Sequence, residues 1–174
     1  MTTTTDSDVP SDDPQRKLAV VRPDDESGLQ HVALVGDIYT ILLTGEQTNG
    51  AYCLIDMRIP PGGGPPPHRH DFEEMFTVLE GEIEVTFRGK KTLVRAGETV
   101  NIPANAPHFF RNVADRPARM YCMCTPAGQE EYFLRVADPV PSATTPPPKF
   151  TEAELAERGK KAADLAAQYR TELL

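Results

Sequence analysis

Tryptophan is absent from this 174-residue sequence, and cysteine and histidine are scarce, with three and four residues. Three cysteines cannot form a dense disulfide framework, so we expect buried, free thiols. No apolar run reaches the roughly 18 residues that a membrane-spanning helix needs. The first residues, MTTTTDSDVPSDDP, have neither the basic nor the apolar region of a signal peptide. These absences predict a cytoplasmic protein with no membrane partner.

Basic residues are also in the minority. Lys and Arg total 18 against 26 Asp and Glu, which gives a net charge of −8. A chain with this charge repels the phosphates of nucleic acids and the surfaces of anionic lipids. The charge therefore argues against a nucleic-acid partner, and its simplest consequence is solubility.

The composition changes along the chain and divides it into four segments. Residues 1–17 are acidic and polar, which predicts a disordered N-terminal tail. Residues 18–140 contain the apolar segments of one domain, and residues 141–150 form a proline-rich linker. Residues 151–174 have a helical pattern, which we describe below.

Short apolar segments separated by Gly, Asn and Pro fill the chain from His31 onward. In EIEVTFR, the apolar residues Ile83, Val85 and Phe87 alternate with polar ones, as in a strand with one buried face. Turn residues recur between such segments, for example Asn49-Gly50 and Gly81. About eight short strands at regular spacing predict an all-β sandwich or barrel.

The C-terminal segment TEAELAERGKKAADLAAQYRTELL predicts an α-helix over residues 151–174. Thr151 and Glu154 have the spacing of a capping box. An apolar stripe follows at helical spacing, made of Leu155, Ala162, Leu165, Tyr169 and Leu173. We expect this helix to dock on the barrel or on a partner subunit.

Two of the four histidines lie in the stretch GGGPPPHRHDFEEMF, residues 62–76. His68 and His70 are two residues apart, so on a strand both imidazoles point to the same face. Glu74 has the same parity and can join them, whereas Glu73 has the opposite parity and is expected to face solvent. An H-x-H pair alone is also compatible with an ordinary solvated loop, so this stretch by itself leaves both interpretations open.

A second cluster, GETVNIPANAPHFFRN, contains His108 directly after Pro107. The two prolines restrict the backbone that leads into this histidine. A ligand that arrives 34 residues after Glu74, from a non-adjacent strand, is what the interior of a barrel would supply. His31 lies outside both clusters, and we interpret it as structural.

The two clusters resemble the two signature motifs of the cupin superfamily. The pattern G-x5-H-x-H-x3-E-x6-G fits the first cluster, and G-x5-P-x-G-x2-H-x3-N fits the second. The matching residues are Gly62, His68, His70, Glu74, Gly81, Gly97, Pro103, His108 and Asn112. Asn105 replaces the usual glycine of the second motif, but Asn tolerates left-handed backbone better than other residues. The resemblance covers about residues 30 to 140.

The resemblance implies an antiparallel β-barrel or jelly roll, followed here by the C-terminal α-helix. It also implies one divalent transition-metal ion in the barrel, and by position its ligands are His68, His70, Glu74 and His108. Nitrogen and oxygen donors suit Fe, Mn, Ni, Co or Zn, and the sequence does not choose among them. Glu74 is either a ligand only or also the catalytic base.

Within the superfamily, the chain looks most like the single-domain quercetin 2,3-dioxygenase-like cupins. This implies dioxygenation of a flavonol or another aromatic or enolic substrate, with O₂ as the second substrate. The lumen should be apolar, with Phe76 and either Phe109 or Phe110 in it. The alternatives are a metal-dependent aromatic polyketide cyclase and a non-catalytic cupin that binds a metal or a small molecule. We also expect a homodimer, because cupin barrels commonly pair edge strands between subunits.

Overall fold

The computed structural model describes residues 9–22 and 28–174. Residues 1–8 of the predicted disordered tail lie outside the described residues, and residues 9–17 form no helix or strand. The chain between Gln30 and Val140 is mostly β-structure. Its strands are β1 (Gln30–Leu34), β2 (Asp37–Leu43), β3 (Cys53–Ile59), β4 (His68–His70), β5 (Glu73–Glu80), β6 (Glu82–Phe87), β7 (Lys90–Arg95), β8 (Thr99–Ile102), β9 (His108–Arg111), β10 (Ala118–Thr125) and β11 (Asp138–Val140).

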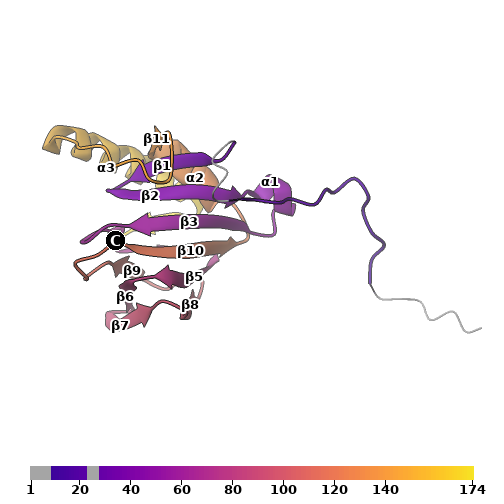
Figure 1. The fold of residues 1–174 in the computed structure, drawn as a ribbon, viewed down its shortest axis with the longest axis horizontal. Coiled ribbons are helices and arrows are strands. Elements are labelled where there is room, and N and C mark those ends of the chain that lie inside the picture. Colours follow the sequence, from indigo (N-terminus) through magenta and orange to yellow (C-terminus); the bar gives the residue numbers. More distant parts are fainter. Residues whose placement is uncertain (1–8, 23–27) are drawn as a thin grey trace, which may run out of the picture.

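Two antiparallel sheets make up the domain. The larger sheet has the strand order β11-β1-β2-β3-β10-β5-β8, and Figure 1 shows these strands one after another from top to bottom. The smaller sheet has the order β12-β4-β9-β6-β7, where β12 is Thr171–Leu173 at the C-terminal end. The predicted all-β antiparallel fold with a C-terminal helix is therefore confirmed.

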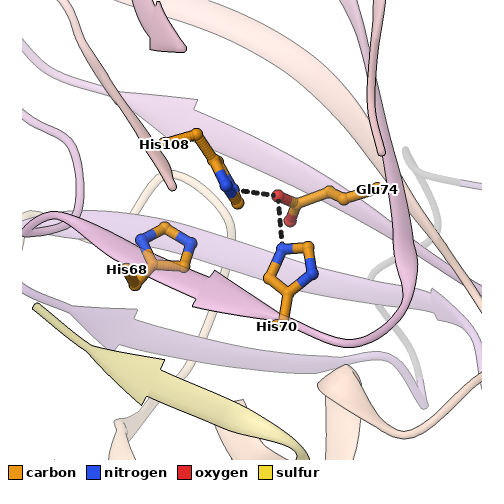
Figure 2. Close-up of side chains that lie close together, drawn as sticks. All are labelled: His68, His70, Glu74 and His108. Atoms are coloured by element: carbon orange, nitrogen blue, oxygen red, sulfur yellow. Dashed lines mark hydrogen bonds and ion pairs between the residues drawn. The ribbon is translucent and has the colours of Figure 1, made fainter. Parts of the chain in front are cut away.

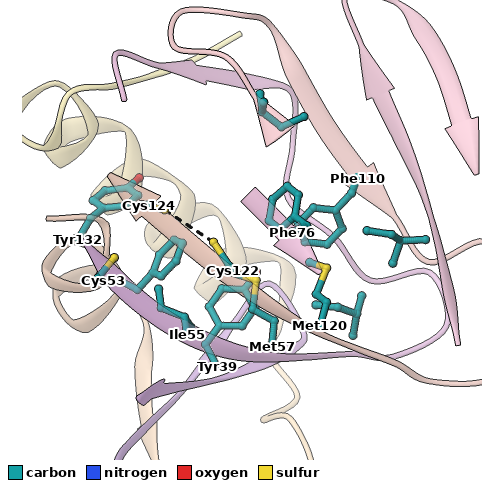
Figure 3. Close-up of a cluster of buried hydrophobic side chains, with 14 of the residues drawn as sticks. Tyr39, Cys53, Ile55, Met57, Phe76, Phe110, Met120, Cys122, Cys124 and Tyr132 are labelled. Carbon is teal, nitrogen blue, oxygen red and sulfur yellow. Dashed lines mark hydrogen bonds between the residues drawn. The ribbon is translucent and has the colours of Figure 1, made fainter. Parts of the chain in front are cut away.

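The core lies between the two sheets. Alternate residues of β3, β10 and β5 are buried on one side, as the period of a strand requires, and residues of β6 and β9 meet them from the other. Phe76 of the larger sheet and Phe110 of the smaller one join the layers, with ring centroids 5.3 Å apart in an edge-on contact (Figure 3). Phe110, and not Phe109, is thus the lumen residue of that pair.

The described residues also form three α-helices, α1 (Gly45–Thr48), α2 (Gln129–Val136) and α3 (Glu152–Ala166), and the short 3₁₀ helix η1 (Ala167–Tyr169). Helix α2 packs against the sheet through Phe133, whose ring centroid lies 5.0 Å from that of Tyr39. It was not expected from the sequence, although its buried residues Gln129, Tyr132, Phe133 and Val136 recur at helical spacing. No helix among residues 9–22 and 28–174 is long and apolar enough to cross a membrane.

The C-terminal helix begins as predicted and ends earlier. Thr151 and Glu154 form the capping box, with the Glu154 amide donating to the Thr151 hydroxyl and the Thr151 amide to the Glu154 carboxylate. The expectation of a helix through residue 174 was wrong, because α3 stops at Ala166 and the last residues form β12. This strand pairs with β4, so the C-terminal end of the chain lies beside His68 and His70.

Candidate metal centre

The glycine- and proline-rich stretch before β4 holds His68 and His70 against β9. Gly64 has a φ of 130° and packs so closely on β9 that a Cβ there would overlap the carbonyl oxygen of Phe110. In β4 the two histidines are buried and Arg69 between them is exposed, as their spacing predicted. His68 is in register with His108 of the neighbouring strand β9.

The four predicted residues come together in the interior of the barrel. The side chains of His68, His70, Glu74 and His108 are only 2–8% exposed, and one donor atom from each lies within 4.8 Å of the others. Figure 2 shows the imidazoles of His70 and His108 directed at the same oxygen of the Glu74 carboxylate. Their Nε2 atoms lie 3.1 and 3.0 Å from Glu74 Oε2.

Backbone carbonyl groups fix the orientation of all three imidazoles. The Nδ1 atoms of His68 and His70 lie 2.9 Å from the carbonyl oxygens of Pro66 and Phe72. In the same way, His108 Nδ1 lies 2.8 Å from the carbonyl oxygen of Ala106. A carbonyl only accepts hydrogen bonds, so each Nδ1 carries the hydrogen and the lone pair of Nε2 faces the centre. This is the tautomer that a metal ligand needs.

The lone pairs and the negative charge of the centre suit a bound cation. Two neutral imidazoles and a carboxylate present only lone pairs to one another, so a proton or a metal ion must lie between them. Burial opposes the charged form of Glu74, but the hydrogen bonds that His108 and His70 donate when Nε2 is protonated prevail and hold its pKa well below the usual value. Burial likewise opposes the imidazolium of His108, yet contact with Glu74 raises the pKa of His108.

His68 differs from the other two histidines in its surroundings. Burial and the neighbouring His108 lower the pKa of His68 to about 4. Its ring makes no contact with Glu74 within hydrogen-bond distance, and the ring centroids of His68 and His108 are 4.4 Å apart. At neutral pH it is therefore an uncharged imidazole with a free Nε2 lone pair.

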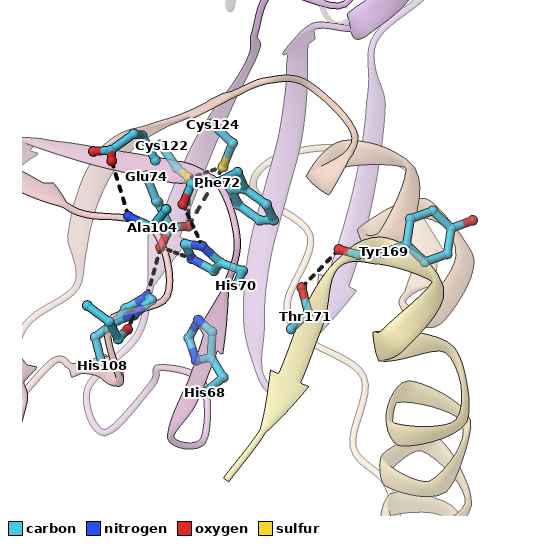
Figure 4. A network of polar contacts seen from close by, with 12 residues as sticks. His68, His70, Phe72, Glu74, Ala104, His108, Cys122, Cys124, Tyr169 and Thr171 are labelled. Carbon is cyan, nitrogen blue, oxygen red and sulfur yellow. Dashed lines mark hydrogen bonds and ion pairs between the residues drawn. The ribbon is translucent and has the colours of Figure 1, made fainter.

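Two thiols contact the other oxygen of Glu74. Cys122 Sγ lies 3.3 Å and Cys124 Sγ 3.8 Å from Glu74 Oε1, and the two sulfur atoms are 3.7 Å apart (Figure 4). Burial raises the pKa of Cys122 to about 12, so its thiol keeps its proton and can donate to Oε1. All three cysteines are free and buried, as expected. The carboxylate is thus bordered by thiols on one side and by imidazoles on the other.

A cavity of about 140 Å³ adjoins the centre. His68 and Glu74 line it, together with apolar side chains that include Met57, Phe76 and Phe110. The cluster therefore borders a dry space in which a small molecule can meet it.

A second buried carboxyl group lies in the same barrel. Asp37 on β2 is fully buried, and its Oδ2 accepts a hydrogen bond of 3.1 Å from the Tyr39 hydroxyl. Its Oδ1 has no hydrogen-bond partner among the described residues. Burial raises the pKa of Asp37 to about 7 despite the bond from Tyr39.

Two details of the sequence interpretation concern residues near the centre. Glu73 points away from it and binds the Asn101 side chain and the Ala104 amide, and Asn105 has the expected left-handed backbone, with a φ of 68°. His31 lies on β1, where its Nδ1 is 2.8 Å from the Thr40 hydroxyl.

The contacts of the thiols with Glu74 and the Asp37–Tyr39 pair were missed. The parity of Cys122 and Cys124 put both on one face, but only the pairing of β10 with β5 places Cys124 opposite Glu74. Nothing in the sequence around Asp37 signals that its side chain is buried.

Known proteins resemble this chain over its central part. Residues 55–124 match the family model Cupin_2, described as a cupin domain. The polyketide synthase CurC of Streptomyces cyaneus is 38% identical over 94 residues, which are 52% of this chain and 60% of that protein. The quercetin 2,3-dioxygenase of Bacillus subtilis is 28% identical over 111 residues, which are 63% of this chain and 33% of that protein. The chain thus spans less than two thirds of either relative.

A solved structure supports the same fold. The polyketide cyclase RemF of Streptomyces resistomycificus superimposes with a TM-score of 0.54 and 22% identity, over 63% of this chain and 80% of that one. At this identity the likeness concerns the fold alone. Residues 55–124 thus match the model of a cupin domain, and the solved structure has a similar fold.

Proposed function

We propose that this chain is a metal-dependent enzyme that catalyses the dioxygenation of an aromatic or enolic small molecule. The observation that carries the proposal is the arrangement around Glu74 Oε2, where two oriented Nε2 atoms and a carboxylate oxygen face one another at 3.0–3.1 Å. Such a set of buried lone pairs is suited to a divalent transition metal, here Fe, Mn, Ni, Co or Zn. The adjoining apolar cavity supports an organic substrate.

Each residue of the centre has a role in this proposal. His68, His70, His108 and Glu74 would hold the ion, which when bound polarises a substrate oxygen and offers open positions to the substrate and to O₂. Glu74 Oε2, which lies between the Nε2 atoms of His70 and His108, accepts the proton of the substrate hydroxyl. Phe76 and Phe110 exclude water from the reacting groups.

A second candidate is a metal-dependent aromatic polyketide cyclase. The likeness to CurC favours it, and an apolar cavity beside a polarising ion suits ring closure without O₂. A non-catalytic cupin that binds a metal or a small molecule is the third possibility.

Oxygen uptake separates the three functions. The purified protein is loaded with each of the five metals in turn and supplied with a flavonol or with smaller enols in an oxygen-electrode cell. Consumption of one O₂ per substrate supports the dioxygenase, and conversion of a polyketide-type substrate without O₂ supports the cyclase. Thermal stabilisation by ligand without any turnover favours a binding protein and would refute both enzymatic functions.

A substitution of Glu74 tests its role as base. Glu74→Gln keeps an oxygen donor near the centre but cannot take a proton, so we expect much of the metal to remain and turnover to fall by about 10²-fold or more. Glu73→Gln is the matched control, because Glu73 is adjacent in sequence and binds Asn101 and Ala104 instead. Metal content and turnover are measured on both variants, and an active, fully loaded Glu74→Gln protein would refute the role.

Two further predictions concern the ion and the assembly. Elemental analysis of the purified protein identifies the bound metal. The exposed edges of the two sheets are β11 and β8, and β12 and β7, and a homodimer would cover at least one of them. Light scattering coupled to gel filtration measures the mass that checks this.

A further inference from the structure

The cavity beside the centre is small. Its volume of about 140 Å³ is close to that of a cavity of roughly 150 Å³ which accommodates benzene. One six-membered ring with small substituents fills such a space. A flavonol, with a fused bicyclic system and a further aryl ring, does not fit inside this space.

The C-terminal segment fixes this size. Ala162 of α3 and Thr171 and Leu173 of β12 form part of the cavity lining. Strand β12 is paired with β4, with Leu173 in register with His68, and the exposed side chains of Arg69 and Glu172 form an ion pair across the two strands. Because this wall is bonded to the strand of the candidate ligands, the cavity cannot widen there without breaking the β12–β4 pairing.

One polar group in the wall has no partner. Gln129, the first residue of α2, lines the cavity and is 95% buried, since 5% of its surface is exposed. Its Oε1 atom has no hydrogen-bond partner among the described residues. A buried acceptor without a partner is costly, and a rotation of the Gln129 amide toward the cavity would bring Oε1 to a donor on a ligand there.

From these features we infer that the substrate is a single-ring enol or phenol that also carries an O–H or N–H donor, which Gln129 recognises. The enol oxygen lies toward the His68 and Glu74 side of the cavity, and the second donor binds Gln129 Oε1. This inference rests on the proposed function, because it takes the four-residue cluster as the place where the enol oxygen is held. It narrows the substrate class from flavonols and polycyclic compounds to monocyclic ones.

Three commercial ligands test size and recognition separately. Kojic acid and allomaltol are hydroxypyranones of one ring that differ only in the hydroxymethyl hydroxyl group of kojic acid, and unsubstituted flavonol carries the same enol and carbonyl pair on a larger ring system. Binding to the zinc-loaded full chain is measured by calorimetry without O₂, and the metal content is checked afterwards because pyranones chelate metals. We expect kojic acid to bind about tenfold tighter than allomaltol, and flavonol at least about tenfold weaker than allomaltol.

Paired variants assign these differences to residues. Gln129→Met removes the acceptor at similar volume and should abolish the preference for kojic acid. Thr86→Val is its control, since Thr86 Oγ1 is also buried without a partner among the described residues but lies outside the cavity. Ala162→Leu should weaken both pyranones about tenfold by filling the space, whereas Ala163→Leu, on the exposed face of the same helix, should not.

The outcomes are distinct from those of the turnover experiment. Flavonol binding as tightly as the pyranones, equal affinities for kojic acid and allomaltol, or a preference that survives in Gln129→Met would each overturn the inference, even if the enzyme is an oxygenase. Pyranone binding with the expected preferences but no turnover would refute the proposed dioxygenase and leave the recognition by Gln129 intact. If Ala162→Leu does not fold, Leu173→Ala replaces it and should reduce the discrimination against flavonol.

Discussion

Two carboxyl groups lie buried in the same barrel and behave in opposite ways. Glu74 and Asp37 are 3% and 0% exposed, so burial penalises the charge of both. The pKa of Glu74 is nevertheless lowered, whereas the pKa of Asp37 is raised to about 7. Burial alone therefore does not decide whether an acid in this core is charged.

Their partners make the difference. Glu74 has imidazoles on Oε2 and thiols on Oε1, so both oxygens are satisfied. Asp37 has the Tyr39 hydroxyl on Oδ2, and its Oδ1 has no partner among the described residues. The comparison teaches that the barrel stabilises a negative charge at the place where a cation would bind and disfavours one elsewhere.

Removing one imidazole beside Glu74 should have the largest effect on stability and on metal affinity. His108→Leu leaves Glu74 buried with fewer partners, so the pKa of Glu74 should rise and the free energy of unfolding of the metal-free protein should fall by about 3–5 kcal/mol. The metal affinity should fall by more than the roughly 10- to 100-fold typical of residues that only orient a ligand. Urea unfolding and metal titration measure the two quantities.

His31→Leu is the control for this substitution. His31 is also buried and has a hydrogen-bond contact with Thr40, but it lies outside the centre. It should cost about 1–3 kcal/mol and leave the metal affinity unchanged. An equal loss of metal affinity in both variants would contradict the special role of the partners of Glu74.

Asp37→Asn should remove the free-energy cost of burying the Asp37 carboxylate, by an amount that depends on pH. Because the pKa of Asp37 is about 7 in the folded protein and 3.8 ordinarily, the folded state keeps a proton that the unfolded state has released between these values. The free energy of unfolding therefore falls as pH rises through this window, by up to about 4 kcal/mol in total. Asparagine does not titrate, so the variant should gain stability relative to the parent from about pH 4 to 7.

Unfolding curves at several pH values across that window check this prediction. His68 titrates in the same range, but its effect on the free energy of unfolding has the opposite sign. Its pKa is lowered to about 4, so the unfolded state takes up a proton first and the free energy of unfolding falls as pH falls. This contribution is common to both proteins and cancels in their difference. A difference in stability that does not change with pH would show that Asp37 is ionised at all these pH values.

The contrast between the two acids also shows what a sequence can and cannot reveal. The spacing of His68, His70 and Glu74 is local, and the period of a strand is enough to put them on one face. His108 could be added because a proline-restricted turn and a motif mark its strand. The same alternation predicted the antiparallel sheets, since each apolar face needs a buried neighbour.

Features that depend on the pairing of distant strands could not be predicted. The sequence TELL continues a helical pattern, and it forms β12 only because β4 offers an edge for pairing. Asp37 stands in GDIYT like an exposed charge at the start of a strand, and the packing of the Gly63–Gly64 loop buries it, since a Cβ at Gly63 would overlap its Oδ1. Local patterns contain no information about such contacts.

The thiol side of Glu74 should contribute less than the imidazole side. Cys122→Ala removes the donor to Oε1 and leaves a small void, so we expect a loss of about 1–2 kcal/mol and a roughly tenfold weaker affinity for the metal. Cys122→Ser keeps a donor at nearly the same place and should restore most of the metal affinity. If serine and alanine weaken the metal equally, the thiol acts by packing and not by orienting the carboxylate.

Removing the Tyr39 hydroxyl from Asp37 should have the smallest effect. Tyr39→Phe removes the hydroxyl that donates to Oδ2, so the pKa of Asp37 should rise above about 7, since that bond lowers it. The ring and its contact with Phe133 are kept, so the cost is that of one hydrogen bond to a charged group, reduced because Asp37 can take up a proton instead. We expect a loss of about 1 kcal/mol above pH 7 and almost none near pH 5, where Asp37 is protonated in both proteins. Unfolding curves at these two conditions measure the difference, and an equal loss at both would mean that Tyr39 does not stabilise the charge of Asp37.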